Sequence, residues 1–140
     1  MRLRRGKKIE IPVTFEVQED IKRISDNSDR SIQEVLYYFA YTGLNKATMS
    51  KIASLPFVEK GKRKHYRLYM RLPTRAVSTL DDIAWQHGFA PYISNNNGGG
   101  YVIGLCANWC LKENSVKYWI AFFSSGCDLQ EIIEDTLWQA

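Results

Sequence analysis

The pattern of apolar and polar positions along this chain occurs twice. Residues 8–13 alternate with period two, which is typical of a half-buried strand, and residues 66–72 alternate in the same way. A shift of 59 positions superimposes the apolar residues of these strands and of the helical pattern after each of them: Ile9 on Leu68, Ile11 on Met70, Val13 on Leu72, Ile21 on Leu80 and Ile24 on Ile83. The chain therefore predicts a strand followed by an amphipathic helix, made twice.

A second helix follows in each copy, at a different offset. A shift of 67 positions superimposes four of its apolar residues: Val35 on Val102, Leu36 on Ile103, Ala40 on Ala107 and Leu44 on Leu111. The two shifts differ by eight residues, so the second copy is expected to carry an insertion between its helices. A strand-helix-helix unit cannot bury its own apolar face, and we expect the two copies to pack on each other.

The expected fold is α+β and mostly helical, with the two strands paired as an antiparallel ribbon. The predicted segments are a first unit over residues 1–47, a connector over 48–64, a second unit over 65–114 with an inserted loop over 89–100, and an extension over 115–140. Within the extension, Val116 to Phe123 is apolar on both faces and is read as a strand, followed by a helix capped by Asp128. This C-terminal strand-helix either completes a sheet or forms a homodimer contact.

Local signals fix several ends of these elements. Thr14 suits the N-cap of the first helix, and Ser31 and Glu34 have the spacing of a capping box at the start of the next. The Asp26–Asp29 segment reads as a turn, and the second helix is expected to stop near Gly43. Pro12 has no backbone N–H to donate, so its strand must either pair on one side only or place Pro12 at its unpaired edge.

Composition indicates a globular chain of 140 residues, of which 45% are apolar and 13% aromatic. This content is ample for a packed core in one domain or two very small ones. No apolar run is long enough to span a bilayer, and the basic N-terminus lacks the apolar stretch of a signal peptide. We therefore expect a cytoplasmic location and no membrane partner.

Positive charge is concentrated in two segments, although the net charge is only +4. Residues 1–8 hold five cations and residues 60–71 hold six, and neither segment contains an acid. Each cluster leads into a predicted strand, which favours a polyanionic partner. The alternative is a solvated surface that keeps the protein soluble.

The three cysteines and two histidines give no catalytic constellation. Cys106 and Cys110 lie on one face of an apolar helix, where cysteines are usually reduced and packed. A zinc site that combines them with Cys127 and His87 is the alternative. Neither histidine stands beside a nucleophile and no carboxylates are paired, so we predict no enzyme activity, metal or cofactor.

The first copy resembles the ribbon-helix-helix family of prokaryotic DNA-binding proteins. The resemblance covers about residues 7–45 and 65–112, and it rests on the following residues of the first copy: Ile9, Ile11 and Val13, the cap Thr14, Ile21-Lys22-Arg23-Ile24-Ser25, and Arg30-Ser31-Ile32-Gln33-Glu34-Val35-Leu36. Members of this family are normally intertwined homodimers, whereas this chain would supply both strands itself. The resemblance implies that the ribbon enters the DNA major groove.

The resemblance also implies which residues contact DNA. Outward side chains of the ribbon would read base edges, and these are Arg67, Tyr69 and Arg71 in the second strand and Lys8, Glu10 and Pro12 in the first. Arginine can bind guanine O6 and N7 bidentately, and Glu10 could accept from cytosine N4. The two strands are unlike, so the expected target is asymmetric. The alternative is that the arginines are solvated surface charges.

Phosphate contacts are expected at two helix starts and in one basic loop. The residues are Arg30 and Ser31 at the second helix of the first copy, Lys62, Arg63 and Lys64 before the second strand, and Gly98 and Gly99 at the matching helix start. Bare amides of the glycines would cradle a phosphate. The alternatives are an ordinary capped helix at the first start and a flexible loop at the glycines.

Two functions follow from the resemblance. The first is a sequence-specific repressor of prokaryotic, plasmid or viral origin that binds double-stranded DNA and is nucleoid-associated. The second is a protein-interaction module that kept the fold without DNA binding, such as an antitoxin-like or phage-encoded inhibitor. Glu10 and Pro12 on the reading face and the apolar tail favour the second.

Overall fold

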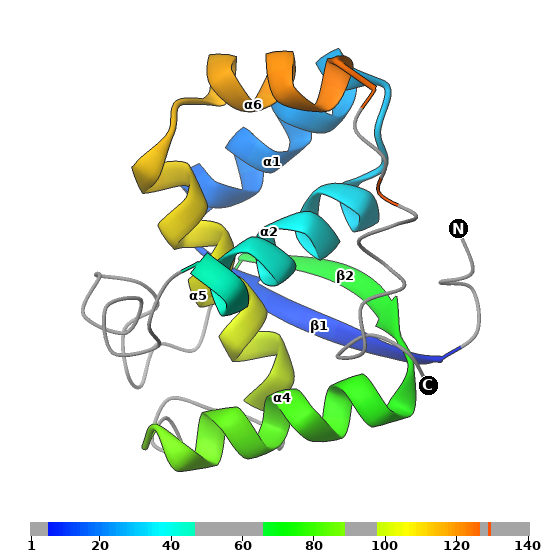
Figure 1. Ribbon diagram of the computed structural model, residues 1–140, viewed down its shortest axis with the longest axis vertical. Helices are drawn as coiled ribbons and strands as arrows, with labels where there is room; N and C mark the ends of the chain where they lie inside the picture. Colours follow the sequence, from blue (N-terminus) through cyan, green and yellow to red (C-terminus); the bar gives the residue numbers. More distant parts are fainter. Residues whose placement is uncertain (1–5, 47–65, 89–97, 127–128, 130–140) are drawn as a thin grey trace.

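Two strands and the helices around them form the described part of the chain (Figure 1). A computed structural model describes residues 6–46, 66–88, 98–126 and 129. The elements are β1 (Lys7–Val13), α1 (Phe15–Ser28), α2 (Ile32–Lys46), β2 (Tyr66–Leu72), α4 (Thr74–Gln86), α5 (Gly98–Glu113) and α6 (Val116–Ser124). The fold is mostly helical with a two-stranded antiparallel sheet, which confirms the predicted α+β class. None of the described helices is long and apolar enough to cross a membrane.

The two predicted strands lie side by side. β1 pairs antiparallel with β2 in a register that places Glu10 opposite Tyr69, Lys8 opposite Arg71 and Pro12 opposite Arg67. Glu10 and Tyr69 are also equivalent under the shift of 59 positions, so equivalent residues of the two strands meet at the centre of the ribbon. One face of the ribbon is buried, and its residues are Ile9, Ile11, Val13, Leu68, Met70 and Leu72.

The outer edge of β2 is occupied by two glutamine side chains. Gln18 Nε2 donates to the carbonyl of Arg67 at 3.0 Å, and the amide of Arg71 donates to Gln33 Oε1 at 2.8 Å. The backbone groups of both arginines therefore point away from β1, so their partners in β1 also point away from β2. Pro12, opposite Arg67, loses no ladder hydrogen bond, which agrees with the expected placement at an unpaired edge.

Each strand packs against a helix from the other half of the chain. α5 packs against β1, whereas α2 packs against β2, and α2 and α5 pack on each other (Figure 1). The strand at the start of the chain thus contacts a helix from its second half, and the later strand contacts a helix from its first half. Because each half completes the packing of the other, the ribbon and these helices form one core.

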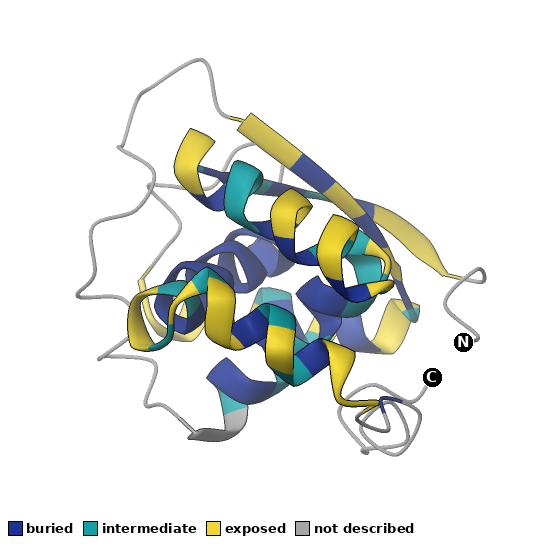
Figure 2. Cartoon of the chain, turned by 90° about the horizontal axis from the view of Figure 1, so that it is seen from above, coloured by how far each residue is buried: buried dark blue, intermediate teal, exposed yellow. Residues whose placement is uncertain are grey.

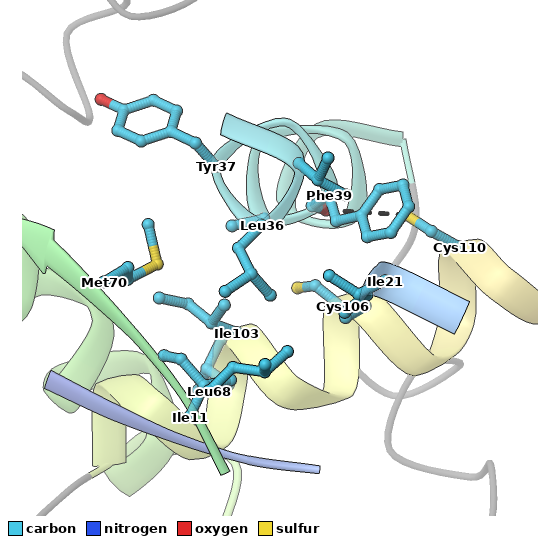
Figure 3. Close-up of a cluster of buried hydrophobic side chains, with 14 of the residues drawn as sticks. Ile11, Ile21, Leu36, Tyr37, Phe39, Leu68, Met70, Ile103, Cys106 and Cys110 are labelled. Atoms are coloured by element: carbon cyan, nitrogen blue, oxygen red, sulfur yellow. Dashed lines mark hydrogen bonds between the residues drawn. The ribbon is translucent and has the colours of Figure 1, made fainter. Parts of the chain in front are cut away.

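The core lies where the inward face of the ribbon meets α1, α2, α4 and α5. Figure 3 shows buried hydrophobic side chains of β1, β2, α1, α2 and α5 gathered there, and Figure 2 shows buried and exposed residues alternating along several of the helices. The following core residues are at most 2% exposed: Ile11, Ile21, Ile24, Leu36, Phe39, Met70, Leu72 and Leu80. The alternation and helical spacing read from the sequence therefore identify the buried faces of β1, β2, α1 and α4.

Most of the expected helix starts are confirmed. Thr14 Oγ1 accepts from the amide of Val17 at 3.2 Å, and α4 begins directly after Pro73. Two helices are longer than expected. α1 includes most of the predicted turn and ends at Ser28, followed by the C-cap Asp29, whose φ of 60° is left-handed. α2 continues past Gly43 to Lys46. The inserted loop also ends earlier than residue 100, because α5 begins at Gly98.

The segment predicted as a third strand is a helix. α6 is capped by Ser115, whose side chain accepts from the amide of Tyr118 at 3.2 Å. Trp119 and Phe123, four residues apart, are buried, and the Trp119 ring lies 4.8 Å from that of Phe39 in α2. Helical spacing of the large aromatic residues explains this arrangement better than alternation. The expected helix capped by Asp128 and the connector lie outside the described residues, apart from Leu129.

Candidate nucleic-acid interface

The outward face of the ribbon carries the residues predicted to read DNA bases. Lys8, Arg67, Tyr69 and Arg71 are exposed, and Glu10 and Pro12 are partly exposed. They alternate with core residues because successive side chains of a strand point to opposite faces. The pairs Lys8–Arg71, Glu10–Tyr69 and Pro12–Arg67 are of the non-hydrogen-bonded kind, in which facing side chains come closest.

Glu10 connects several of these side chains at the centre of the ribbon. Its Oε1 lies 3.0 Å from Nε of Arg67 and 3.5 Å from the hydroxyl of Tyr69. Lys8 Nζ lies 4.9 Å from the centre of the Tyr69 ring, within the range of a cation–π contact. The Arg67 side chain is 45% exposed, and an exposed ion pair contributes at most about 1 kcal/mol to stability. The main effect of this network is to orient the side chains on the outward face.

Arg71 has a different partner at the end of the ribbon. Its Nη1 donates to the carbonyl of Gly6 at 3.2 Å. Gly6 has a φ of +137°, and a Cβ added there would lie 2.2 Å from the carbonyl oxygen of Leu72. A glycine is therefore required where the chain enters β1, and this close crossing places the Gly6 carbonyl beside Arg71.

The two ends of the ribbon differ in chemistry. One end presents the exposed cations Lys7, Lys8 and Arg71. At the other end, the rings of Phe15 and Tyr66 lie 5.1 Å apart and are about half exposed, at 51% and 50%. The ribbon therefore has a basic end and an aromatic end.

The polar groups at the start of α2 already have hydrogen-bond partners within the chain. The capping box is confirmed: the Ser31 amide donates to Glu34 Oε1 at 3.2 Å, and the Glu34 amide donates to Ser31 Oγ at 3.1 Å. Arg30 Nη1 lies 3.3 Å from Glu34 Oε2, and its Nε donates to the carbonyl of Phe123 at 3.4 Å. A phosphate at Arg30 and Ser31 would have to compete with the carboxylate of Glu34.

The prediction of a bare backbone amide does not hold for Gly99 at the start of α5. The Gly99 amide donates to Asp81 Oδ1 of α4 at 2.6 Å, and both Gly98 and Gly99 are buried. Added Cβ atoms at these positions would lie 3.0 Å from Ala84 Cβ and 3.2 Å from Leu80 Cβ. These glycines permit close packing of α5 on α4, and a carboxylate occupies the place expected for a phosphate.

The predicted phosphate contacts Lys62, Arg63 and Lys64 lie outside the described residues.

Two residues near the ribbon were not predicted, namely Gln18 and Gln33, which occupy the outer edge of β2. Their partners lie 49 and 38 positions away in sequence, so no local pattern signals them. Gln33 also shows that the first turn of α2 lies beside the ribbon.

Other chemical groups in the described part of the chain do not form a site. No three His, Cys, Asp or Glu side chains there are grouped to hold a metal ion. Cys106 is fully buried, and desolvation raises the pKa of its thiol to about 12, so it is not a nucleophile. An open hollow along α1 is lined by four acids and two cations, which does not suit a polyanion: Glu16, Glu19, Asp20, Asp26, Lys22 and Arg23.

Comparison with known proteins adds no relative to this picture. The chain matches no protein-family model, no curated protein and no solved structure. Inferences about its function therefore rest on the ribbon and its outward face.

Proposed function

We propose that this chain is a sequence-specific double-stranded DNA-binding protein of ribbon-helix-helix type, in which one chain supplies both units. It would act as a transcriptional repressor of prokaryotic, plasmid or viral origin, in the cytoplasm and associated with the nucleoid. The observation that carries this proposal is the exposure of Arg67 and Arg71 on one face of an antiparallel ribbon whose other face is core.

The chemistry of the outward face suits the major groove. That groove admits a two-stranded ribbon, and arginine binds guanine O6 and N7 bidentately for about 1–3 kcal/mol of discrimination. Arg67 and Arg71 lie on the outward face of β2 on either side of Tyr69, and Lys8 lies opposite Arg71. A ribbon seated in this way over a promoter would exclude polymerase, which is the simplest mechanism of repression.

The helices that pack on each strand also favour a protein in which one chain supplies both ribbon-helix-helix units. In an intertwined dimer each strand contacts the helices of its partner, and here β1 contacts α5 while β2 contacts α2. Equivalent residues Glu10 and Tyr69 face each other at the ribbon centre, as they would across a two-fold axis. α6 buries Trp119 and Phe123 within its own chain, so those two side chains pack internally.

The test is a selection of bound fragments from a random duplex library at physiological salt. The double variant Arg67→Ala/Arg71→Ala is compared with Lys22→Ala/Arg23→Ala, which removes the same charge from exposed positions on α1. We expect the wild type and the α1 variant to enrich one sequence, and the ribbon variant to lose that preference by about 100-fold. No enrichment by the wild type, or equal losses in both variants, would contradict the proposal.

A protein-interaction module is the second candidate. The aromatic end of the ribbon favours it, because Phe15 and Tyr66 are about half exposed side by side, and aromatic residues are enriched at protein interfaces. Recovery of a stoichiometric protein partner, lost in Tyr66→Ala but kept in Arg71→Ala, together with no duplex enrichment, would favour this candidate.

A further inference from the structure

The backbones of Arg67 and Arg71, the two arginines on the outward face of the ribbon, are each held by a glutamine from a helix. Gln18 of α1 donates from Nε2 to the carbonyl of Arg67 at 3.0 Å. Gln33 of α2 accepts on Oε1 from the amide of Arg71 at 2.8 Å. Both glutamines are partly buried, and α1 and α2 both pack against β2. The backbones of the two arginines are therefore tied to the helices near both ends of the outer edge of β2.

The repeat does not reproduce the contact between Gln33 and Arg71 in its other half. The shift of 67 positions carries Gln33 onto Gly100, and the shift of 59 positions carries Arg71 onto Pro12. A glycine has no side chain that could accept, and a proline has no N–H to donate. Both members of this hydrogen bond are therefore missing on the side of β1.

The contact made by Gln18 is missing from the other half for a similar reason. The shift of 59 positions carries Gln18 onto Val77, whose side chain is apolar and only 6% exposed. A buried valine cannot donate to the carbonyl of a strand. The two glutamine contacts thus belong to the strand that carries both arginines and are not a general property of the repeated unit.

An arginine that reads a base needs a fixed backbone as well as a free guanidinium group. Because its side chain is long, a small shift or twist of the strand displaces the guanidinium group from a bidentate contact. Supporting residues have to hold such a contact within about 0.5 Å. Gln18 and Gln33 bind backbone groups at the edge of β2, so they leave the outward side chains of Arg67 and Arg71 exposed.

We propose that Gln18 and Gln33 are positioning residues, each of which sets the orientation of one base-reading arginine. Gln18 acts through the backbone of Arg67, and Gln33 acts through the backbone of Arg71. Loss of either glutamine relaxes discrimination at one base pair and does not weaken binding to all duplexes alike. This inference rests on the proposed DNA-binding function and deepens it.

The first experiment assigns each glutamine to a base pair. Every base pair of the duplex enriched by the wild type is substituted in turn, and binding is measured by fluorescence anisotropy at one salt concentration. Arg67→Ala and Arg71→Ala identify the base pair that each arginine reads. Gln33→Ala should reduce discrimination about fivefold at the base pair read by Arg71, and Gln18→Ala should do the same at the other. The control Gln86→Ala, at an exposed position of α4, should change neither.

A matched pair of glutamate variants tests the direction of each hydrogen bond. An ionised glutamate has acceptor oxygens but no hydrogen to donate. Gln33→Glu keeps an acceptor for the amide of Arg71 and should retain the discrimination of the wild type. Gln18→Glu loses the donor to the carbonyl of Arg67 and should behave as Gln18→Ala does. Discrimination compares two duplexes with one variant, so the general effect of added negative charge on DNA affinity cancels.

Amide hydrogen exchange in the free protein checks one contact without DNA. The amide of Arg71 should exchange about tenfold faster in Gln33→Ala than in the wild type or in Gln33→Glu. Thermal unfolding of the same samples shows that the variants are folded. Equal exchange in all three proteins would mean that Gln33 does not hold the strand, and it would overturn the inference.

The outcomes distinguish this inference from the proposed function. If the wild type enriches a duplex but the glutamine variants leave discrimination unchanged, or weaken binding to every duplex alike, the glutamines only support the strand and DNA binding stands. Self-association of the variants with unchanged discrimination would mean that the glutamines protect the strand edge instead. If the wild type enriches no duplex, the DNA-binding function and this inference fail together.

Discussion

Gly43 of α2 lies directly against Cys106 of α5. A Cβ added to Gly43 would be 2.7 Å from both Cβ and Sγ of Cys106. A related contact occurs nearby, where Cys110 Sγ lies 3.6 Å from the carbonyl oxygen of Phe39. The shift of 67 positions carries Phe39 onto Cys106 and Gly43 onto Cys110, so the two contacts correspond to each other under the repeat. α2 and α5 therefore cross closely at Gly43, where any side chain larger than a hydrogen would overlap Cys106.

The substitution Gly43→Ala should therefore destabilise the protein. Alanine normally stabilises a helix interior by about 1 kcal/mol relative to glycine, but here its Cβ would overlap Cys106. We expect a net loss of about 1–3 kcal/mol in the free energy of unfolding, measured by urea denaturation. An increase in stability would show that α2 and α5 do not approach this closely.

Truncating a side chain should cost much more stability on the buried face of the ribbon than on its outward face. Ile11→Ala removes a side chain that is 0% exposed, and we expect it to cost about 2–5 kcal/mol of stability. Tyr69→Ala, at a site that is 50% exposed, should cost less than about 1 kcal/mol while it weakens DNA binding. Thermal unfolding of both variants checks this contrast, and comparable losses would mean that the outward face is covered.

Folding should not depend on protein concentration, because one chain supplies both ribbon strands. An obligate homodimer of this type becomes more stable as its concentration rises. Here we expect the midpoint of thermal unfolding to stay constant over about a 100-fold range of concentration. A midpoint that rises with concentration would point to a second copy as part of the folded unit.

Alkaline pH should destabilise the fold in part through Cys106. Burial raises the pKa of this thiol from 9.0 to about 12, so below pH 9.0 it is protonated in both the folded and unfolded chain. Above that pH the unfolded chain ionises first, and stability falls as the pH rises towards the folded value. Between about pH 8 and about pH 10.5, urea denaturation should show a larger loss for the wild type than for Cys106→Ala. The comparison with Cys106→Ala removes the contribution of other groups that titrate in this range. Equal losses of stability in the two proteins would show that Cys106 is in contact with water in the folded chain.

The sequence predicts most of the fold because its elements are amphipathic. Alternation around Ile9 and Ile11 and helical spacing around Ile21 and Ile24 each leave one face to bury, and the structure buries those faces. The segment over 116–123 is apolar on both sides, so its periodicity does not separate a strand from a helix. The signal that would have decided it is Ser115, an N-cap residue placed before the pair Trp119 and Phe123.

The site was less predictable than the fold, because its decisive contacts link distant parts of the sequence. Asp81 occupies the amide of Gly99 from a different helix, and Phe123 accepts from Arg30 across 93 positions. A motif read locally shows which groups are present but not which partners already hold them. The outward residues of the ribbon could be predicted, since they depend only on the parity of the strand.

Having both strands in one polypeptide frees the chain from a constraint that applies to identical subunits. In a symmetric pair, one substitution in the gene alters both halves of the contact surface at once. Here Glu10 and Tyr69 occupy corresponding places yet differ in size, charge and hydrogen-bonding capacity. Each strand can therefore diverge independently, and a single gene can evolve a contact surface whose two strands carry different chemistry.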